Sequence, residues 1–234
     1  MKTLGIIGGV GPSSTAEFYL KISYDCQKRN HLQRPDIVIV SIPTPYQVER
    51  DMILHNLNNY TPLLIAGAKR LQEADADFLV IPCNTLHCDI EVIRRAVDIP
   101  IMSIVEESIA YIKKMGYKKV GLLATAATVE REIYSQPFRH NGIEFLVPNP
   151  EDQTELNKRI INIVDGKCLD CDRQFLHEVI HKLKAQGTDC IVLACTELPL
   201  LRPEREQKDI PIFDTMTILA GAALDEILKE SDLL

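Results

Sequence analysis

The sequence is poor in several features that would point to common protein classes. It has no tryptophan, 6% aromatic residues and no apolar run approaching the ~18 residues of a membrane-spanning helix. Its basic clusters are short, such as Lys113-Lys114 and Lys118-Lys119, and its net charge is −7. A chain without a basic surface has no electrostatic footprint for nucleic acid or for an anionic membrane. We therefore expect a small-molecule partner, no nucleic acid and no membrane.

The amino terminus lacks the features of a secretion signal. Lys2 precedes an apolar run, residues 4–7, that Gly8 and Gly9 interrupt, and this run is too short for a signal-peptide core. We therefore expect a cytoplasmic protein. In that reducing compartment its cysteines should be free thiols unless they bind a metal or take part in chemistry. The seven cysteines are Cys26, Cys83, Cys88, Cys168, Cys171, Cys190 and Cys195.

What the sequence does contain is enough apolar material for a substantial core, and an internal repeat. Its 234 residues, 46% of them hydrophobic, can form one large domain or two small ones. Three stretches recur in the same order: residues 77–86 match 189–198, residues 2–7 match 118–123, and residues 98–101 match 209–212. In the first pair both copies read as a buried strand that ends in a cysteine, Cys83 or Cys195. The repeats predict two homologous halves.

Short apolar runs alternate with longer amphipathic patterns in both halves. Strands are expected near residues 4–8, 37–41, 77–82, 99–102, 119–124, 143–147, 189–194 and 210–213. Helices are expected near residues 13–29, 61–74, 88–97 and 104–115, with a last helix from about residue 217. This alternation predicts an α/β fold of two halves related by pseudo-twofold symmetry, each a mostly parallel four-stranded sheet flanked by helices. The predicted domains are residues 1–116, whose last helix is free to cross over, and residues 117–234.

The glycine loop after the first strand does not match a nucleotide-binding motif. Ser14 occupies the place where a dinucleotide fingerprint needs glycine or alanine, and the loop has no P-loop lysine. A tight strand-to-helix turn, with Pro12 near the first helical residue, is the simpler interpretation. This helix N-terminus could still hold a small anion such as a carboxylate.

A second motif, His177-Glu-Val-Ile-His181, matches the zinc-protease pattern and follows Cys168 and Cys171 closely. Helical spacing argues against zinc, because an apolar face formed by residues 176, 179, 180 and 183 leaves both histidines on the polar flank. The cysteine pair is also closer to the first histidine than zinc-finger spacing allows. We therefore predict no metal.

The repeated cysteines favour acid-base chemistry. Ligands of parallel sheets bind beyond the carboxyl ends of the strands, where Gly8, Gly9, Cys83, Thr125 and Cys195 fall. A symmetric packing of the halves would place Cys83 and Cys195 across one cleft. A helix N-terminus is expected to lower the pKa of each thiol below its free value of ~8.5. Two opposed thiols suit removal of a proton from one face of a carbon and its return to the other, with backbone N–H groups and hydroxyls stabilising the developing charge.

At these residues the chain resembles the cofactor-independent aspartate/glutamate racemase family over its whole length. The matching motifs are Gly8-Gly-Val-Gly-Pro12 with Thr15, Pro82-Cys-Asn-Thr85 with His87, Gly121-Leu-Leu-Ala-Thr125, and Cys195-Thr-Glu197. The resemblance implies two similar α/β domains around the active site, a homodimer, and no pyridoxal phosphate or other cofactor. It also implies that Cys83 and Cys195 are the acid/base pair. The residues implied around the substrate are Val10, Asn84, Thr85, Thr125 and Thr196.

The resemblance is less complete at the position that sets the substrate side chain. Aspartate-specific members carry an arginine after the second strand, and Arg50 is the nearest candidate here. A lysine expected in the second half has no counterpart, since Asp165 falls near its place beside Lys167. We expect aspartate as substrate, with glutamate or a broader range if the second basic group is missing. The alternatives are a related isomerase or decarboxylase of another carboxylic acid, and a binding protein of the same fold without turnover.

Overall fold

The computed structural model describes residues 1–30, 33–54, 60–167, 170–203 and 207–229. Two parallel four-stranded sheets form the framework, in the orders β2-β1-β3-β4 and β6-β5-β7-β8. The strands of the first sheet are β1 (Leu4–Gly8), β2 (Ile37–Ser41), β3 (Phe78–Val80) and β4 (Ile101–Met102). Those of the second are β5 (Lys119–Ala124), β6 (Glu144–Leu146), β7 (Cys190–Ala194) and β8 (Ile212–Asp214). The identical strand order confirms the predicted α/β fold of two similar sheets.

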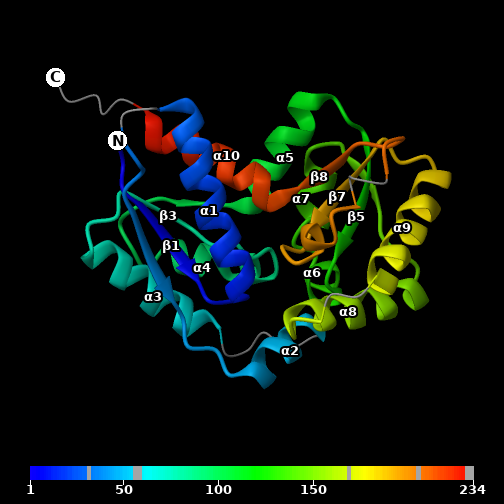
Figure 1. Cartoon of the computed structure of the whole chain (residues 1–234), viewed down its shortest axis with the longest axis horizontal. Helices are drawn as coiled ribbons and strands as arrows, with labels where there is room; N and C mark the ends of the chain where they lie inside the picture. The colour runs from blue at the N-terminus through cyan, green and yellow to red at the C-terminus, as the bar shows by residue number, and fades with distance from the viewer. Residues whose placement is uncertain (31–32, 55–59, 168–169, 204–206, 230–234) are drawn as a thin grey trace.

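Helices connect the strands and cover both sheets (Figure 1). In the first part of the chain they are α1 (Pro12–Arg29), α2 (Tyr46–Leu54), α3 (Thr61–Glu73), η1 (Thr85–Asp89), α4 (Ile90–Arg94) and α5 (Ile104–Met115). In the second they are α6 (Ala126–Glu130), α7 (Ser135–His140), α8 (Pro150–Val164), α9 (Asp170–Ala185), η2 (Leu198–Leu201) and α10 (Thr215–Leu228). Among the described residues, no helix is long and apolar enough to cross a membrane.

The ends of several helices follow from local chemistry. The Ser103 hydroxyl accepts hydrogen bonds from the backbone N–H groups of Val105 and Glu106 and so caps the start of α5. Gly116 ends the same helix with φ of 80°, a left-handed conformation that favours glycine. Asp214 caps α10 in the same way as Ser103 caps α5. These caps place the first turn of each helix directly after the carboxyl end of a strand.

The buried apolar side chains of the described residues form three clusters, and the largest of them is shared by the two sheets. It contains Leu4 and Ile6 of the first sheet together with Val120, Leu122 and Val192 of the second, all fully or almost fully buried. Burial of apolar side chains common to both sheets gives the halves a large stabilising contact. The absence of a Pro-, Gly- or Ser-rich linker in the sequence agrees with this tight packing.

Helices from each half reach across to the other half. The red helix α10 packs against α1 and α5, while α2, from the first part of the chain, packs against α6 and α8 (Figure 1). The backbone N–H of Lys2 also donates to the carbonyl of Ile227 over 3.1 Å, which fastens the two ends together. The proposed division after residue 116 stays a prediction.

The sequence-based elements differ from the structure mainly where helices are short. The expected helix near residues 88–97 is a 3₁₀ turn, η1, followed by the single-turn α4. The helix α2 was not predicted, because its nine residues carry too few apolar positions for a clear periodic pattern. The apolar face predicted for α9 is confirmed, with Leu176, Val179, Ile180 and Leu183 buried.

Candidate active site

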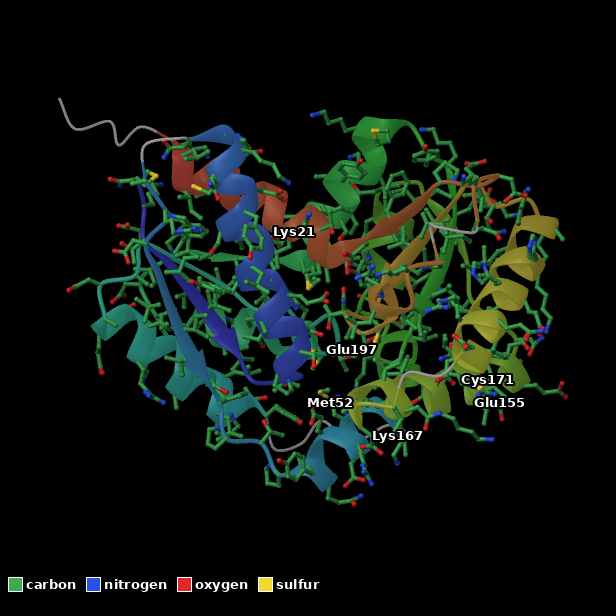
Figure 2. All side chains as sticks on the ribbon, in the orientation of Figure 1. Lys21, Met52, Glu155, Lys167, Cys171 and Glu197 are labelled. Atoms are coloured by element: carbon green, nitrogen blue, oxygen red, sulfur yellow. The ribbon has the colours of Figure 1, made fainter. Side chains whose placement is uncertain are left out.

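A narrow cavity lies between the two sheets and contains both repeated cysteines. Its lining comes from the loop before α1, from α2 and from the segments after β3, β5 and β7. The lining residues are Val10, Gly11, Glu49, Met52, Ile53, Cys83, Asn84, Thr85, Thr125, Val164, Cys195, Thr196 and Glu197. Figure 2 shows Met52 and Glu197 near the middle of the molecule, between the two sheets. The carboxyl ends of the strands therefore meet at one shared site, as expected for parallel sheets.

Cys83 is held by the backbone of the turn that follows β3. Its sulfur accepts hydrogen bonds from the backbone N–H groups of Thr85 and Leu86 at the start of η1. Nδ1 of His87 lies 2.8 Å from the carbonyl oxygen of Cys83, and the backbone N–H of Ile104 donates to Nε2 over 3.2 Å. Because Nε2 accepts, the imidazole is neutral, and burial lowers the pKa of His87 to about 4. His87 therefore fixes the backbone that carries Cys83.

Cys195 has a carboxylate as its neighbour. Its thiol lies 3.2 Å from Oε2 of Glu197, to which it donates, and the hydroxyl of Thr196 donates to the same oxygen over 3.1 Å. The other oxygen, Oε1, accepts from the hydroxyl of Ser14 over 2.8 Å. Ser14 lies in the first turn of α1, so a carboxylate of the second half contacts this turn, and the expected binding of a small anion at the helix N-terminus stays a prediction.

Burial raises the pKa of both thiols. For Cys83 burial and then the Glu197 charge raise the pKa to about 12, outweighing the N–H groups of Leu86 and Thr85. For Cys195 burial and then the same charge raise the pKa well above its ordinary value. The prediction that helix N-termini give these thiols a lowered pKa is therefore wrong. Burial is the main cause, and no lysine, arginine or histidine lines the cavity in the described part of the chain to oppose it.

Hydroxyl and amide groups from both halves line the floor of the cavity. The hydroxyl oxygens of Thr85, Thr125 and Thr128 lie 2.9 to 3.1 Å from one another. The hydroxyl of Tyr134 donates to Oδ1 of Asn84, while Nδ2 of Asn84 donates to the hydroxyl of Thr215. These bonds span η1 in one half and α6, α7 and α10 in the other. They fix the polar groups before any ligand arrives, which is the preorganisation that anion binding needs.

The loop between β1 and α1 leaves room for two carboxylates. A β-carbon on Gly11 would lie 3.1 Å from Oε1 of Glu197 and 3.5 Å from Oε1 of Glu49. Glu49 itself is 7% exposed. Burial, followed by the charges of Glu197 and Asp165, raises the pKa of Glu49. The glycine loop thus borders a site whose fixed charges are negative.

Comparison with known proteins places this arrangement in a family. The family model described as Asp/Glu/hydantoin racemase matches residues 7–223. The chain is 31% identical over 229 residues to the broad specificity amino-acid racemase RacX of Bacillus subtilis, covering 96% of this chain and 98% of that protein. The chain belongs to the Asp/Glu/hydantoin racemase family. It is an amino-acid racemase of that family.

Solved structures of similar chains share the fold of this racemase. A Yersinia pestis structure assigned to the Asp/Glu racemases has a TM-score of 0.85 and 31% identity, with 98% of this chain and 100% of that chain covered. The aspartate racemase of Picrophilus torridus has a TM-score of 0.82 and 26% identity, with 97% and 94% covered. The resemblance seen in the motifs therefore extends to the complete three-dimensional arrangement of both halves.

Most of the site residues expected from the sequence of the racemase meet in the cavity, but Arg50 does not. Val10, Asn84, Thr85, Thr125 and Thr196 line it with the two cysteines. The guanidinium of Arg50 points instead to Asp165, with Nη2 2.7 Å from Oδ1. Lys167 joins the same carboxylate, 3.6 Å from Oδ2. That Arg50 binds the side-chain carboxylate of a substrate stays a prediction.

Sequence reasoning missed Glu49, Met52 and Ile53 of α2, and it gave Glu197 no role. A signal was present at α2, because an acidic residue three and four positions before Met52 and Ile53 shares their helical face. The motif of His177 and His181 lies elsewhere, on α9, and Cys168 lies outside the described residues. Within the described ranges, no group of three or more His, Cys, Asp or Glu side chains could hold a metal ion.

Proposed function

We propose that this racemase inverts the α-carbon of a free amino acid by proton transfer between Cys83 and Cys195. One cysteine removes the α-proton as a thiolate, and the other, as a thiol, delivers a proton to the opposite face. The roles exchange for the other enantiomer. The single observation that carries this proposal is that two cysteines from equivalent strands of the two halves line one narrow cavity.

The proposal needs a thiolate in a site where both thiol pKa values are raised. A bound amino acid brings its own α-ammonium group, whose positive charge opposes the effect of Glu197 on the sulfurs. Glu197 lies beside Cys195 and is the natural acceptor for that group. The substrate therefore supplies a positive charge that the lining residues do not provide, and its binding favours the thiolate.

The α-carboxylate is proposed to lie over the hydroxyl and amide groups of Asn84, Thr85, Thr125 and Thr196. As the α-proton leaves, negative charge grows on this carboxylate, so donors fixed in advance lower the barrier. The loop at Val10 closes the same side of the cavity. No other group is required for the proton transfer, so we propose that no cofactor takes part.

Solvent exchange tests the proposal directly. Enantiopure amino acids are incubated with the enzyme in D2O, and deuterium at Cα is followed by mass spectrometry while circular dichroism follows the loss of optical activity. A panel including aspartate and glutamate, the substrates expected from the sequence, should show deuterium incorporation together with racemisation. Racemisation that survives in both Cys83→Ser and Cys195→Ser would disprove the two-cysteine mechanism. Binding without exchange would show a protein that keeps the pocket without turnover.

We also propose that the active protein is a homodimer in the cytoplasm. Leu20 and Tyr24 are neighbours on one face of α1 and are 44% and 55% exposed. A second copy covering this face would remove apolar surface from water. Light scattering should show a dimer that Tyr24→Lys weakens, while Val92→Lys on α4, a similarly exposed apolar position, has no effect. The free thiols of the described cysteines suit a reducing compartment.

A further inference from the structure

One carboxylate in the lining of the cavity, that of Glu49, has no role in the proposed racemisation step. Of the ionisable groups lining the cavity, Glu197 has partners for both oxygens, while Oε1 of Glu49 is buried and accepts no hydrogen bond within the described part of the chain. A buried acceptor without a partner is costly, and more costly when it carries charge. A carboxylate in that position indicates a ligand group that donates to it.

The position of Glu49 indicates which part of an amino acid would meet it. Glu49 and Val164 line both the cavity of the cysteines and an adjoining groove, whose walls include Pro43 and Tyr46. Glu197, by contrast, accepts a hydrogen bond from Cys195, and the proposed mechanism assigns the α-ammonium group to it. Glu49 is therefore the carboxylate at the exit from the reaction centre, along the path that a long substrate side chain would follow.

The cations near this exit are already paired. Arg50 and Lys167 both line the groove, and both contact the carboxylate of Asp165. A substrate with an acidic side chain would have to compete with Asp165 for one of these cations and would also approach Glu49 and Glu197. A substrate with a positively charged side chain meets neither obstacle.

We propose that Glu49 binds the positively charged end of the substrate side chain, so that this racemase acts on basic amino acids, such as arginine, lysine or ornithine, better than on acidic ones. The inference rests on the proposed racemisation, whose side-chain specificity it names. It departs from the acidic substrates expected from the motifs, because the basic residue expected to bind a distal carboxylate is turned toward Asp165.

Substrate pairs of equal shape test the inference in the unmodified enzyme. Citrulline replaces the guanidinium of arginine by a neutral group of the same size, and norleucine replaces the ammonium of ornithine by a methyl group. The racemisation kcat/KM should be at least about tenfold higher for arginine than for citrulline, and for ornithine than for norleucine, since an ionic hydrogen bond is lost in each neutral partner. Arginine should also exceed glutamate. Equal values within the pairs, or a preference for glutamate, would overturn the inference.

Variants of Glu49 identify the group responsible. Glu49→Gln should lower kcat/KM for arginine by about 10- to 100-fold and leave citrulline within about threefold. Asp51→Asn is the matched control, because it removes one negative charge from α2 at a residue outside the lining and should leave both substrates unchanged. Glu49→Lys should reverse the preference toward glutamate. An equal loss for arginine and citrulline in Glu49→Gln would mean that Glu49 binds the α-ammonium group or only supports the fold, and would overturn the inference.

The same measurements separate this inference from the function on which it rests. Deuterium exchange at Cα of neutral or acidic amino acids alone would overturn the side-chain assignment and leave the two-cysteine racemisation in place. Exchange with no amino acid in the panel, basic ones included, would overturn both. Exchange that is fastest with arginine, lysine or ornithine, and that depends on Glu49, supports both.

Discussion

The segments around Cys83 and Cys195 have the same position in their sheets, but they differ in the charge of the neighbouring residues. Each cysteine follows the third strand of its sheet order, β3 or β7, and each precedes a 3₁₀ turn, η1 or η2. Two residues after Cys83 the chain has Thr85, whose hydroxyl joins the neutral group of threonines. Two residues after Cys195 it has Glu197, whose carboxylate contacts the thiol.

The comparison shows that the fold sets where the sulfurs lie and that nearby side chains set their charge states. Burial is the largest cause for both thiols and raises both pKa values. Glu197 then acts on both, but only Cys195 also donates a hydrogen bond to it. Among the described residues, Cys83 has no such hydrogen bond to a carboxylate. Its backbone position is instead fixed by neutral His87, which is hydrogen-bonded to the carbonyl of Cys83. The two cysteines should therefore respond differently to changes around them.

The largest effect is expected from replacing one cysteine at a time. Cys83→Ser and Cys195→Ser should each lower the racemisation rate by about 10²- to 10⁴-fold, because each removes one positioned acid or base. Deuterium exchange at Cα, measured from each pure enantiomer, should survive better from opposite enantiomers in the two variants. Exchange lost equally from both enantiomers in both variants would show that the cysteines do not serve opposite faces.

The next largest effect is expected at His87, whose hydrogen bond fixes the backbone of Cys83. The pKa of His87 is about 4, below its ordinary value, so the unfolded chain takes up a proton first as the pH falls. This contribution to stability is present above pH ~6.5 and is lost toward pH ~4, with a loss of roughly 3 kcal/mol. In urea unfolding, His87→Asn should lack this part of the acid sensitivity and should be about 2 kcal/mol less stable at neutral pH.

His140 provides the control for this prediction, because it is exposed at the end of α7. His140→Asn should leave the stability at neutral pH unchanged. The same acid sensitivity in His87→Asn as in the unmodified protein would mean that His87 is not held neutral in the folded state.

A smaller effect is expected from removing the charge beside Cys195. Glu197→Gln should lower the pKa of both thiols, and of Cys195 more, because Cys195 also loses the hydrogen bond that favours its protonated form. A decrease of about one pKa unit raises the thiolate fraction about tenfold, so iodoacetamide should alkylate Cys195 faster at pH ~9. Peptide mass spectrometry gives the rate for each cysteine. The control is Cys190, a buried thiol without Glu197 among its neighbours. A larger change at Cys83 than at Cys195 would contradict the comparison.

The smallest effect is expected at the ion pair that joins α2 to the end of α8. Arg50 is 47% exposed, and exposed pairs contribute little to stability. Arg50→Ala should therefore lower the melting temperature only slightly and change kcat/KM for glutamate by less than about threefold. If Arg50 leaves Asp165 to bind a distal carboxylate, the loss for glutamate should exceed about tenfold. Lys167→Ala, which removes the weaker contact to Asp165, is the matched variant.

Much of the fold could be predicted because the strands have clear local sequence patterns and because the sequence contains an internal repeat. The strands β1, β2 and β5 have the predicted bounds, since continuous apolar runs between turn residues define buried strands. The repeat placed Cys83 and Cys195 at equivalent points without any structure. The thiol pKa values were predicted in the wrong direction, because their main cause, burial away from any cation, depends on side chains far apart in the sequence.

The two parallel sheets, the equivalence of the two cysteines and the family motifs around them follow from the order of the residues alone. The crossing of α2 to the second half, where its partners are α6 and α8, becomes visible only in the folded chain. That crossing buries Glu49 beside Gly11 and turns Arg50, one residue later, toward Asp165. The physical reason is that adjacent residues of a helix point about 100° apart. The packing of α2 on the other half therefore determines that Glu49, and not Arg50, lines the cavity.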